Sequence, residues 1–139
     1  MLKGSIVALI TPFKDENLSE GEYIKLINYH LENGTNGVVP GGTTGESPTL
    51  SHNEHRKIIE IAVKECKGKI PVIAGTGSNS TDEAVALSKH AEKAGSDALL
   101  IVTPYYNKPT QEGLFQHYKK INDNVGVPII IYNIPSRSV

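Results

Sequence analysis

Short runs of apolar residues alternate along the chain with longer segments in which apolar residues recur at helical spacing. The first pattern is typical of buried β-strands and the second of amphipathic helices. We expect strands at Ser5–Ile10, Gly37–Pro40, Pro71–Ala74, Asp97–Val102 and Val127–Tyr132. We expect helices at Ser19–Glu32, Ser51–Cys66, Thr81–Lys93 and Gln111–Asn122. Strands that are apolar throughout are buried on both faces, so the expected sheet is parallel and flanked by helices.

Residues at the segment ends support these assignments. Ser51 precedes a helical pattern and Glu54 follows at the matching position, which predicts a capping box. Gly34 and Gly95 follow two of the expected helices, where a left-handed stop is common. The strand–helix unit repeats about every thirty residues, the size of one βα unit. No linker or low-complexity segment divides the chain, which predicts a single domain over residues 1–139.

Alternating strands and helices fit either a closed barrel or a doubly wound open sheet. An open nucleotide-binding sheet usually has a glycine fingerprint after its first strand, and Thr11–Lys14 has none. Gly75-Thr76-Gly77 follows a later strand, but it lacks the third glycine and a tight turn explains it. Polar or aromatic residues end every expected strand, which favours strand ends that converge on one site. These residues are Thr11, Thr43, Thr44, Thr76, Tyr105, Tyr106 and Tyr132.

The segment Gly41–Leu50 carries the clearest candidate chemistry. Its sequence, GGTTGESPTL, places Thr43 and Thr44 between glycines directly after a short buried strand. Backbone N–H groups and hydroxyls in such a loop can hold a small anion. A glycine-rich loop whose threonines only cap the backbone would show the same residues. The leading hypothesis is therefore a small-molecule site.

Composition and charge narrow the possible partners. The 139 residues have a formal net charge of −1 and no Lys/Arg cluster, which argues against nucleic acid and against an anionic membrane surface. No apolar stretch approaches membrane-spanning length, and the N-terminus lacks a signal-type cleavage pattern. Cys66 is the only cysteine, so we expect no disulfide framework and a cytoplasmic location. We predict no metal site and no cofactor.

Four motifs stand in the order and spacing of the dihydrodipicolinate synthase family: GTTGE at 42–46, PVIAGTG at 71–77, TPYYNKP at 103–109 and YNIPSR at 132–137. The resemblance covers the whole chain. It implies an α/β fold of the (β/α)8 TIM-barrel type, with about the first five strands and four helices in this chain. It also implies a lyase that condenses pyruvate with aspartate 4-semialdehyde through a lysine Schiff base, giving 4-hydroxy-tetrahydrodipicolinate for lysine and diaminopimelate biosynthesis.

Two alternatives to this activity stay open. Other pyruvate-dependent class I aldolases of the N-acetylneuraminate lyase superfamily share the Gly-x-Thr-Gly-Glu loop, although the TPYYNKP loop and Arg137 resemble the synthase more. A half-barrel without catalysis is the second alternative, because a complete barrel needs about 250 residues. The family's Schiff-base lysine lies on a sixth strand, beyond Val139. We assign that role to no lysine here, Lys108 included, and expect the 139-residue chain alone to be inactive.

The resemblance implies roles for residues of the active site. Thr44, Tyr106 and Tyr132 would form a catalytic hydroxyl relay that moves protons during imine formation and release. Thr43, Thr44 and Arg137 would bind substrate, with the planar guanidinium suited to a carboxylate. Tyr106 would reach across a dimer interface, in a complete enzyme expected to be a homodimer or homotetramer. Taken singly, an interface Tyr106, a core Tyr132 and a solvated Arg137 are plainer accounts.

The resemblance also implies an inter-subunit site at which L-lysine acts as a feedback inhibitor. A carboxylate and an amide there would suit the ammonium group of the ligand, and hydroxyl and imidazole groups would suit its other end. The expected residues are Ser47, His52, His55, Asn79, Glu83 and Tyr105. Pro48 stands where alanine occurs in some inhibited relatives. Solvated polar residues on helix faces would explain the same pattern without a ligand.

Overall fold

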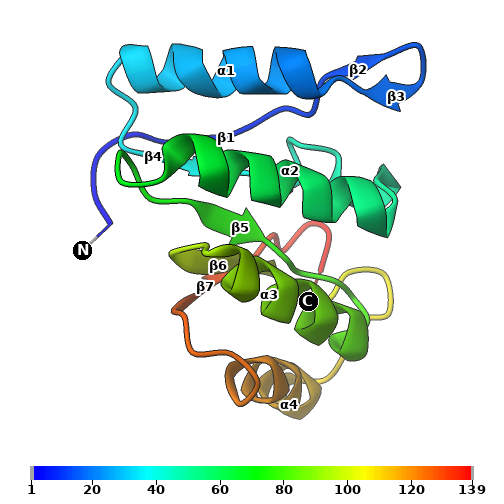
Figure 1. The fold of residues 1–139 in the computed structure, drawn as a ribbon. Helices are drawn as coiled ribbons and strands as arrows, with labels where there is room; N and C mark the ends of the chain where they lie inside the picture. Colours follow the sequence, from blue (N-terminus) through cyan, green and yellow to red (C-terminus); the bar gives the residue numbers. More distant parts are fainter. Residues whose placement is uncertain (1, 139) are drawn as a thin grey trace.

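The computed structural model describes residues 2–138 and has one layer of parallel strands with helices along one face (Figure 1). The parallel strands are β1 (Ile6–Ala8), β4 (Gly37–Val39), β5 (Ile73–Gly75), β6 (Ala98–Val102) and β7 (Ile129–Tyr132). The helices are α1 (Glu20–Glu32), α2 (His52–Cys66), α3 (Thr81–Ala94) and α4 (Gln111–Asn122). Each range expected from the sequence overlaps one of these elements, although β5 and α3 each end one residue later than expected.

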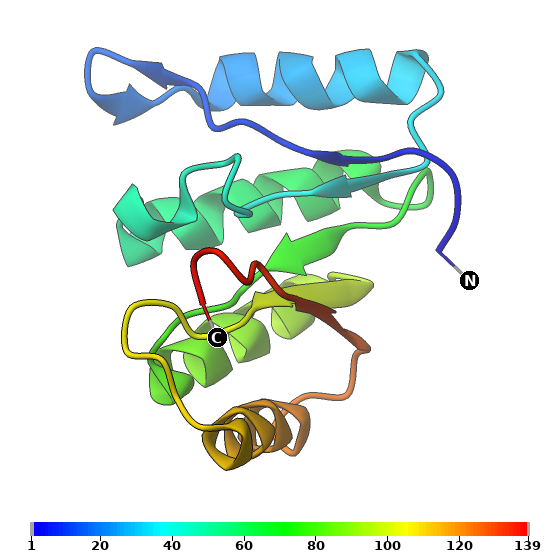
Figure 2. The ribbon, with the colours of Figure 1, turned by 180° about the vertical axis from the view of Figure 1, so that it is seen from behind.

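The parallel strands lie side by side in their order along the chain. β1 pairs with β4, and β6 lies between β5 and β7. A parallel bridge between Val38 and Val72 joins the two groups, with the Val38 N–H 3.1 Å from the Pro71 carbonyl. Helices α2 and α3 lie in front of the strands in Figure 1 and behind them in Figure 2. This order is that of a βα-barrel wall, whereas a doubly wound sheet reverses its order and carries helices on both faces.

The helix-facing side of the strands holds the main hydrophobic core. Val38, Leu99 and Ile101 of the strands are buried in it together with Ile27 of α1 and Ile58 of α2. Burying one such side chain contributes about 1.5–3 kcal/mol relative to leaving it exposed. This packing fixes the positions of the strands, and so it also fixes the positions of the loops at their carboxyl ends.

The opposite side of the strands carries a smaller apolar cluster. Val39, Ile73 and Ala98 are buried there, and Leu100 and Ile130 pack against them. Successive side chains of a strand point to opposite faces, which separates Val39 from the helix-facing core. Leu100 also lines the cavity described below, so this cluster adjoins the candidate site through that residue.

The helix ends follow the expected local chemistry. The Ser51 hydroxyl accepts a bond from the Glu54 N–H at 3.3 Å, and the Glu54 carboxylate accepts one from the Ser51 N–H at 2.8 Å. The predicted capping box is therefore confirmed, and hydrogen bonds from Ser51 hold the pKa of Glu54 below its usual value. Gly34 and Gly95 have φ angles of +76° and +104°, as left-handed helix stops require.

Three short elements were not expected from the sequence. A hairpin of β2 (Phe13–Lys14) and β3 (Asn17–Leu18) follows the first strand. Its turn residues, Asp15 and Glu16, have φ angles of +50° and +62°, although tight hairpins usually place Asn or Gly in this conformation. A 3-10 helix, η1 (Ser47–Thr49), lies between the threonine loop and α2.

Three further features of the described residues concern membrane-spanning helices, metal-ligand groups and the single cysteine. No helix within residues 2–138 is long and apolar enough to cross a membrane. The same part of the chain contains no group of three or more His, Cys, Asp and Glu side chains arranged for a metal ion. Cys66 is buried, and burial raises the pKa of its thiol to about 11, so the sulfur is protonated at neutral pH.

Candidate functional site

A cavity of about 450 Å³ lies at the carboxyl ends of the strands β4 to β7. Four residues expected in the active site line it: Thr43, Tyr106, Tyr132 and Arg137. Leu100 and Val102 form part of its apolar wall. Arg137 is the one charged side chain in the lining contributed by residues 2–138. A largely apolar cavity with hydroxyl groups and a single cation suits a small anionic ligand.

The loop that carries Thr43 and Thr44 is a tight turn that a buried hydrogen bond and a close backbone contact hold in place. The Thr11 hydroxyl donates to the Gly45 carbonyl at 2.7 Å. A Cβ atom at Gly45 would come within 2.8 Å of the Leu9 carbonyl oxygen, so a side chain there would push the loop off the end of β1. Both threonines are exposed. Their hydroxyls are therefore presented on a backbone that buried groups hold in place.

The backbones of Gly41 and Gly75 touch beneath this loop. The Gly75 N–H donates to the Pro40 carbonyl at 2.8 Å, and a Cβ atom at Gly75 would overlap the carbonyl group of Gly41. His55 completes the contact, because its Nε2–H donates to the Gly75 carbonyl at 2.8 Å. Burial lowers the pKa of His55, which favours the neutral imidazole. The requirement for glycine at position 75 is thus steric.

The loop after β6 presents an exposed tyrosine on an unusual backbone. Tyr106 and Lys108 have φ angles of +69° and +42°, in the region that side chains other than glycine seldom adopt. The Tyr106 side chain is 91% exposed. The side-chain amide of Asn107 donates to the Asn79 carbonyl at 3.2 Å, and that of Asn79 donates to the Tyr105 carbonyl at 3.3 Å. Two asparagines therefore brace a loop that projects Tyr106 outwards.

The structure gathers most of the expected active-site residues but not the hydroxyl relay itself. Thr44 adjoins Thr43 in the loop but does not line the cavity. No hydrogen bond joins the hydroxyls of Thr44, Tyr106 and Tyr132 within residues 2–138; Tyr132 is bonded instead through its backbone carbonyl, to Thr103. The relay therefore stays a prediction.

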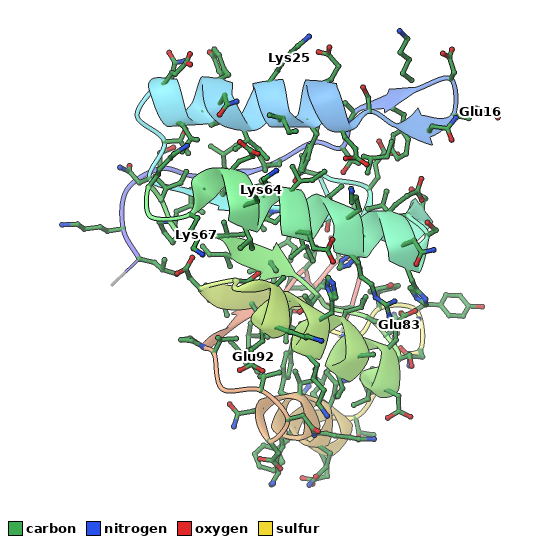
Figure 3. All side chains as sticks on the ribbon, in the orientation of Figure 1. Glu16, Lys25, Lys64, Lys67, Glu83 and Glu92 are labelled. Atoms are coloured by element: carbon green, nitrogen blue, oxygen red, sulfur yellow. The ribbon has the colours of Figure 1, made fainter. Side chains whose placement is uncertain are left out.

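A second cavity, of about 90 Å³, adjoins the first at the N-terminal ends of α2 and α3. Five of the six residues expected to bind lysine line it, namely Ser47, His52, His55, Glu83 and Tyr105. The sixth, Asn79, lies outside the lining and contacts the Tyr105 backbone. Figure 3 shows Glu83 near the start of α3.

Glu83 is the electrostatic centre of the second cavity. Its carboxylate accepts hydrogen bonds from the Ser78 hydroxyl and from His52 Nε2, the latter at 2.7 Å. The bond from Ser78, followed by that from His52, lowers the pKa of Glu83. The side chain is therefore an anion at neutral pH, available to a cationic group.

Several residues that shape the first cavity were not predicted as site residues. Thr103 and Ser138 line it, and both are buried. Thr103 directly follows a predicted strand, so a polar residue at a strand end was a usable signal. Ser138 carries no such signal, since its role depends on the turn that folds it back towards Asn133.

Comparison with known proteins agrees with this geometry. The model of the Dihydrodipicolinate synthetase family matches residues 1–139. The 4-hydroxy-tetrahydrodipicolinate synthase of Pelagibacter ubique is 72% identical over 139 residues, which are 100% of this chain and 47% of that protein. The chain spans about half the length of the curated relatives it matches.

Solved structures give the same result. The chloride-inhibited dihydrodipicolinate synthase of Acinetobacter baumannii, complexed with pyruvate, superposes with a TM-score of 0.95 at 52% identity, over 99% of this chain and 47% of that one. The dihydrodipicolinate synthase of Cyanidioschyzon merolae with lysine bound superposes with a TM-score of 0.91 at 40% identity, over 96% of this chain and 47% of that one. The chain therefore belongs to the dihydrodipicolinate synthetase family.

Proposed function

We propose that the complete protein is a 4-hydroxy-tetrahydrodipicolinate synthase, which condenses pyruvate with aspartate 4-semialdehyde for lysine and diaminopimelate biosynthesis. The observation that carries this proposal is the first cavity, whose lining within residues 2–138 combines the threonine loop and tyrosines with Arg137 as its one charged group. Its position at the carboxyl ends of parallel strands is the usual place for the active site of a barrel enzyme. The remaining part of the complete protein would close the (β/α)8 barrel.

Substrate binding would divide between the threonine loop and the arginine. Thr43 and the N–H groups of its loop offer several donors to the pyruvate carboxylate within a small space. Arg137 offers a planar fork that can hold a second carboxylate through two parallel bonds. A lysine at position 137 would keep the charge but lose that geometry.

Proton transfer would use Thr44, Tyr132 and Tyr106. Hydroxyl groups in a chain can pass protons during imine formation and release without adding a charge to the site. The 91% exposure of Tyr106 supports its contribution to the relay of a second subunit, because a large aromatic side chain is seldom left in solvent without a partner. We therefore propose a homodimer or homotetramer as the active form.

The nucleophilic lysine would lie outside residues 1–139. No lysine lines either cavity within the described residues. Lys25, for example, projects from α1 away from the strands (Figure 3). Lys108 is exposed in the loop after β6 and does not reach the lining. A Schiff-base lysine must be desolvated and held beside the carboxylate site, a condition that these side chains do not meet.

Borohydride trapping tests this proposal on the complete protein. Reduction in the presence of pyruvate should add one pyruvyl group, and peptide mapping should place it outside residues 1–139. Lys108→Arg should form the adduct as the parent does. An adduct on Lys108 would overturn our placement of the nucleophile. Product analysis with aspartate 4-semialdehyde and with sugar-derived aldehydes separates the synthase from another aldolase of the superfamily.

We further propose that L-lysine inhibits the complete enzyme at the second cavity. Glu83→Ala removes the anionic acceptor for the ligand's ammonium group and leaves the first cavity intact. Losing a charge-assisted hydrogen bond costs about 1.5–3 kcal/mol, so the inhibition constant should rise roughly ten- to a hundred-fold. The measurement is a lysine titration of initial rates.

Asp82→Ala is the matched control for this titration. Asp82 precedes Glu83 on α3, but its carboxylate is bonded to Lys120 at 2.6 Å and lies outside the second cavity. This variant should keep the parent's sensitivity to lysine. If millimolar lysine does not inhibit the parent enzyme, the proposed regulatory role of the second cavity is wrong, and its residues are only part of an interface surface.

A further inference from the structure

The carbonyl of Tyr132 is fixed by a buried threonine on the neighbouring strand. Thr103 is 3% exposed and directly follows β6. Its N–H and its hydroxyl both donate to the Tyr132 carbonyl, at 2.9 and 3.1 Å. Two bonds from one residue to one acceptor tie the end of β7 to the end of β6, next to the first cavity.

A second buried hydroxyl closes the turn that carries Arg137. Ser138 is 5% exposed, and its hydroxyl lies 2.8 Å from the Ile134 carbonyl and 3.1 Å from Asn133 Oδ1. The N–H groups of Arg137 and Ser138 also donate to the Ile134 carbonyl, at 2.9 and 3.0 Å. Arg137 therefore lies in a closed turn anchored at both ends.

Asn133 joins the two anchors into one bridge. Its Oδ1 is 3.1 Å from the Ser138 hydroxyl and 3.4 Å from the Thr103 hydroxyl. Tyr118 of α4 extends the bridge, with its hydroxyl 3.3 Å from Thr103 Oγ1. Burial raises the pKa of Tyr118, so this hydroxyl keeps its proton and remains a donor. We call Thr103, Asn133 and Ser138 the hydroxyl–amide bridge.

We propose that the hydroxyl–amide bridge consists of positioning residues, which orient Tyr132 and Arg137 towards the first cavity without touching the reacting atoms. Packing alone cannot fix these two side chains, because Tyr132 and most residues as far as Arg137 are exposed. The Thr103 hydroxyl is directed at a backbone carbonyl, which leaves Tyr132 as the group presented to ligand. The assignment rests on the proposed synthase function.

Thr103→Val in the complete enzyme removes the hydroxyl and keeps the side-chain shape. The expected result is a fall in kcat of roughly ten- to a hundred-fold, since small displacements of a reacting group have effects of this size. KM for pyruvate should change by less than about threefold, because the threonine loop is untouched and a threefold change is under 1 kcal/mol. The Thr103→Ser variant keeps the hydroxyl, so its kcat should stay close to that of the parent.

Thr76→Val is the matched control. Thr76 also follows a strand and is fully buried, with its hydroxyl 2.9 Å from Ser88 Oγ, but it lies outside the cavity lining. The Thr76→Val variant should lower the midpoint of thermal unfolding about as much as Thr103→Val does, and it should leave kcat unchanged. Equal losses of kcat in the two variants would overturn the proposal.

Ser138→Ala tests the other end of the bridge in a turn where loss of folding is not expected. It should raise KM for the substrate carboxylate bound by Arg137 by about tenfold, the usual cost of a displaced charged contact, with little change in kcat. An unchanged KM would contradict the role assigned to Ser138.

Crystal structures of these variants decide the question independently of the reaction. Tyr132 or Arg137 should shift in Thr103→Val and in Ser138→Ala but not in Thr76→Val. Unmoved side chains would overturn the proposal, and combined with lost activity they would mean that Thr103 contacts substrate itself. If the parent protein makes no product from pyruvate and aspartate 4-semialdehyde, the proposed function is refuted. The positioning role is still tested in that case, because the positions of Tyr132 and Arg137 can be compared between the variant and parent crystal structures.

Discussion

Thr44→Val in the complete enzyme should lower kcat by about 10²-fold or more, the usual contribution of general acid–base transfer. Valine keeps the volume of threonine but removes the hydroxyl that would stand between Tyr132 and the substrate. Pyruvate binding should suffer less, because Thr43 and the N–H groups of the loop are unchanged. Steady-state kinetics in both substrates, with the oligomeric state checked, measure the effect.

Thr49→Val is the control for this change. Thr49 is exposed in η1, and its hydroxyl donates to the Glu46 carbonyl at 3.0 Å, outside the cavity lining. The Thr49→Val variant should keep kcat near the parent value. If Thr44→Val also turns over normally, Thr44 serves the packing of the loop and the proposed relay lacks its first member.

Gly75→Ala should destabilise the complete protein by at least about 3 kcal/mol, beyond the usual cost of an overpacked site. A methyl group at position 75 would overlap the Gly41 carbonyl, which is backbone and cannot rotate away as a side chain could. Relief would require β5 to separate from the loop that carries Thr43. Loss of pyruvate binding should therefore accompany any fraction that folds.

Gly21→Ala gives the opposite expectation at a matched chemical change. A Cβ atom at Gly21, in the first turn of α1, would meet no neighbouring atom. Alanine there should stabilise the protein by about 0.4–1 kcal/mol through the unfolded state. Thermal midpoints and soluble yield of both variants provide the measurement. A Gly75→Ala protein as stable as the parent would show that the close approach of Gly41 and Gly75 is not maintained.

The fold was predictable wherever local chemistry and tertiary packing agree. Ser51 announces the start of α2 because a hydroxyl there satisfies N–H groups that the helix leaves free. The hairpin at Phe13–Leu18 was not predictable, because Asp15 and Glu16 adopt left-handed conformations that their types seldom favour. Sequential strand order also could not be read from alternation, which a doubly wound sheet shares.

The candidate site was predictable to the level of strand ends. Thr43 and Arg137 follow strands and Tyr132 ends one. Parallel strands bring their carboxyl ends to one edge, so the meeting of these residues at the cavity follows from pattern and resemblance together. The contact of Thr103 with the Tyr132 carbonyl was not predictable. It depends on the register that sets Val102 opposite Tyr132, and apolar runs do not specify register.

Sequential strand order has a consequence for how the chain acquires its structure during synthesis. Each parallel strand after β1 pairs with the one made about one βα unit earlier, roughly thirty residues back. No strand must wait for a partner encoded far downstream before it can pair on one side. Closure of long loops slows folding, so this order favours growth of the wall unit by unit as the polypeptide leaves the ribosome. β1 and β4 would then act as a template onto which later units dock.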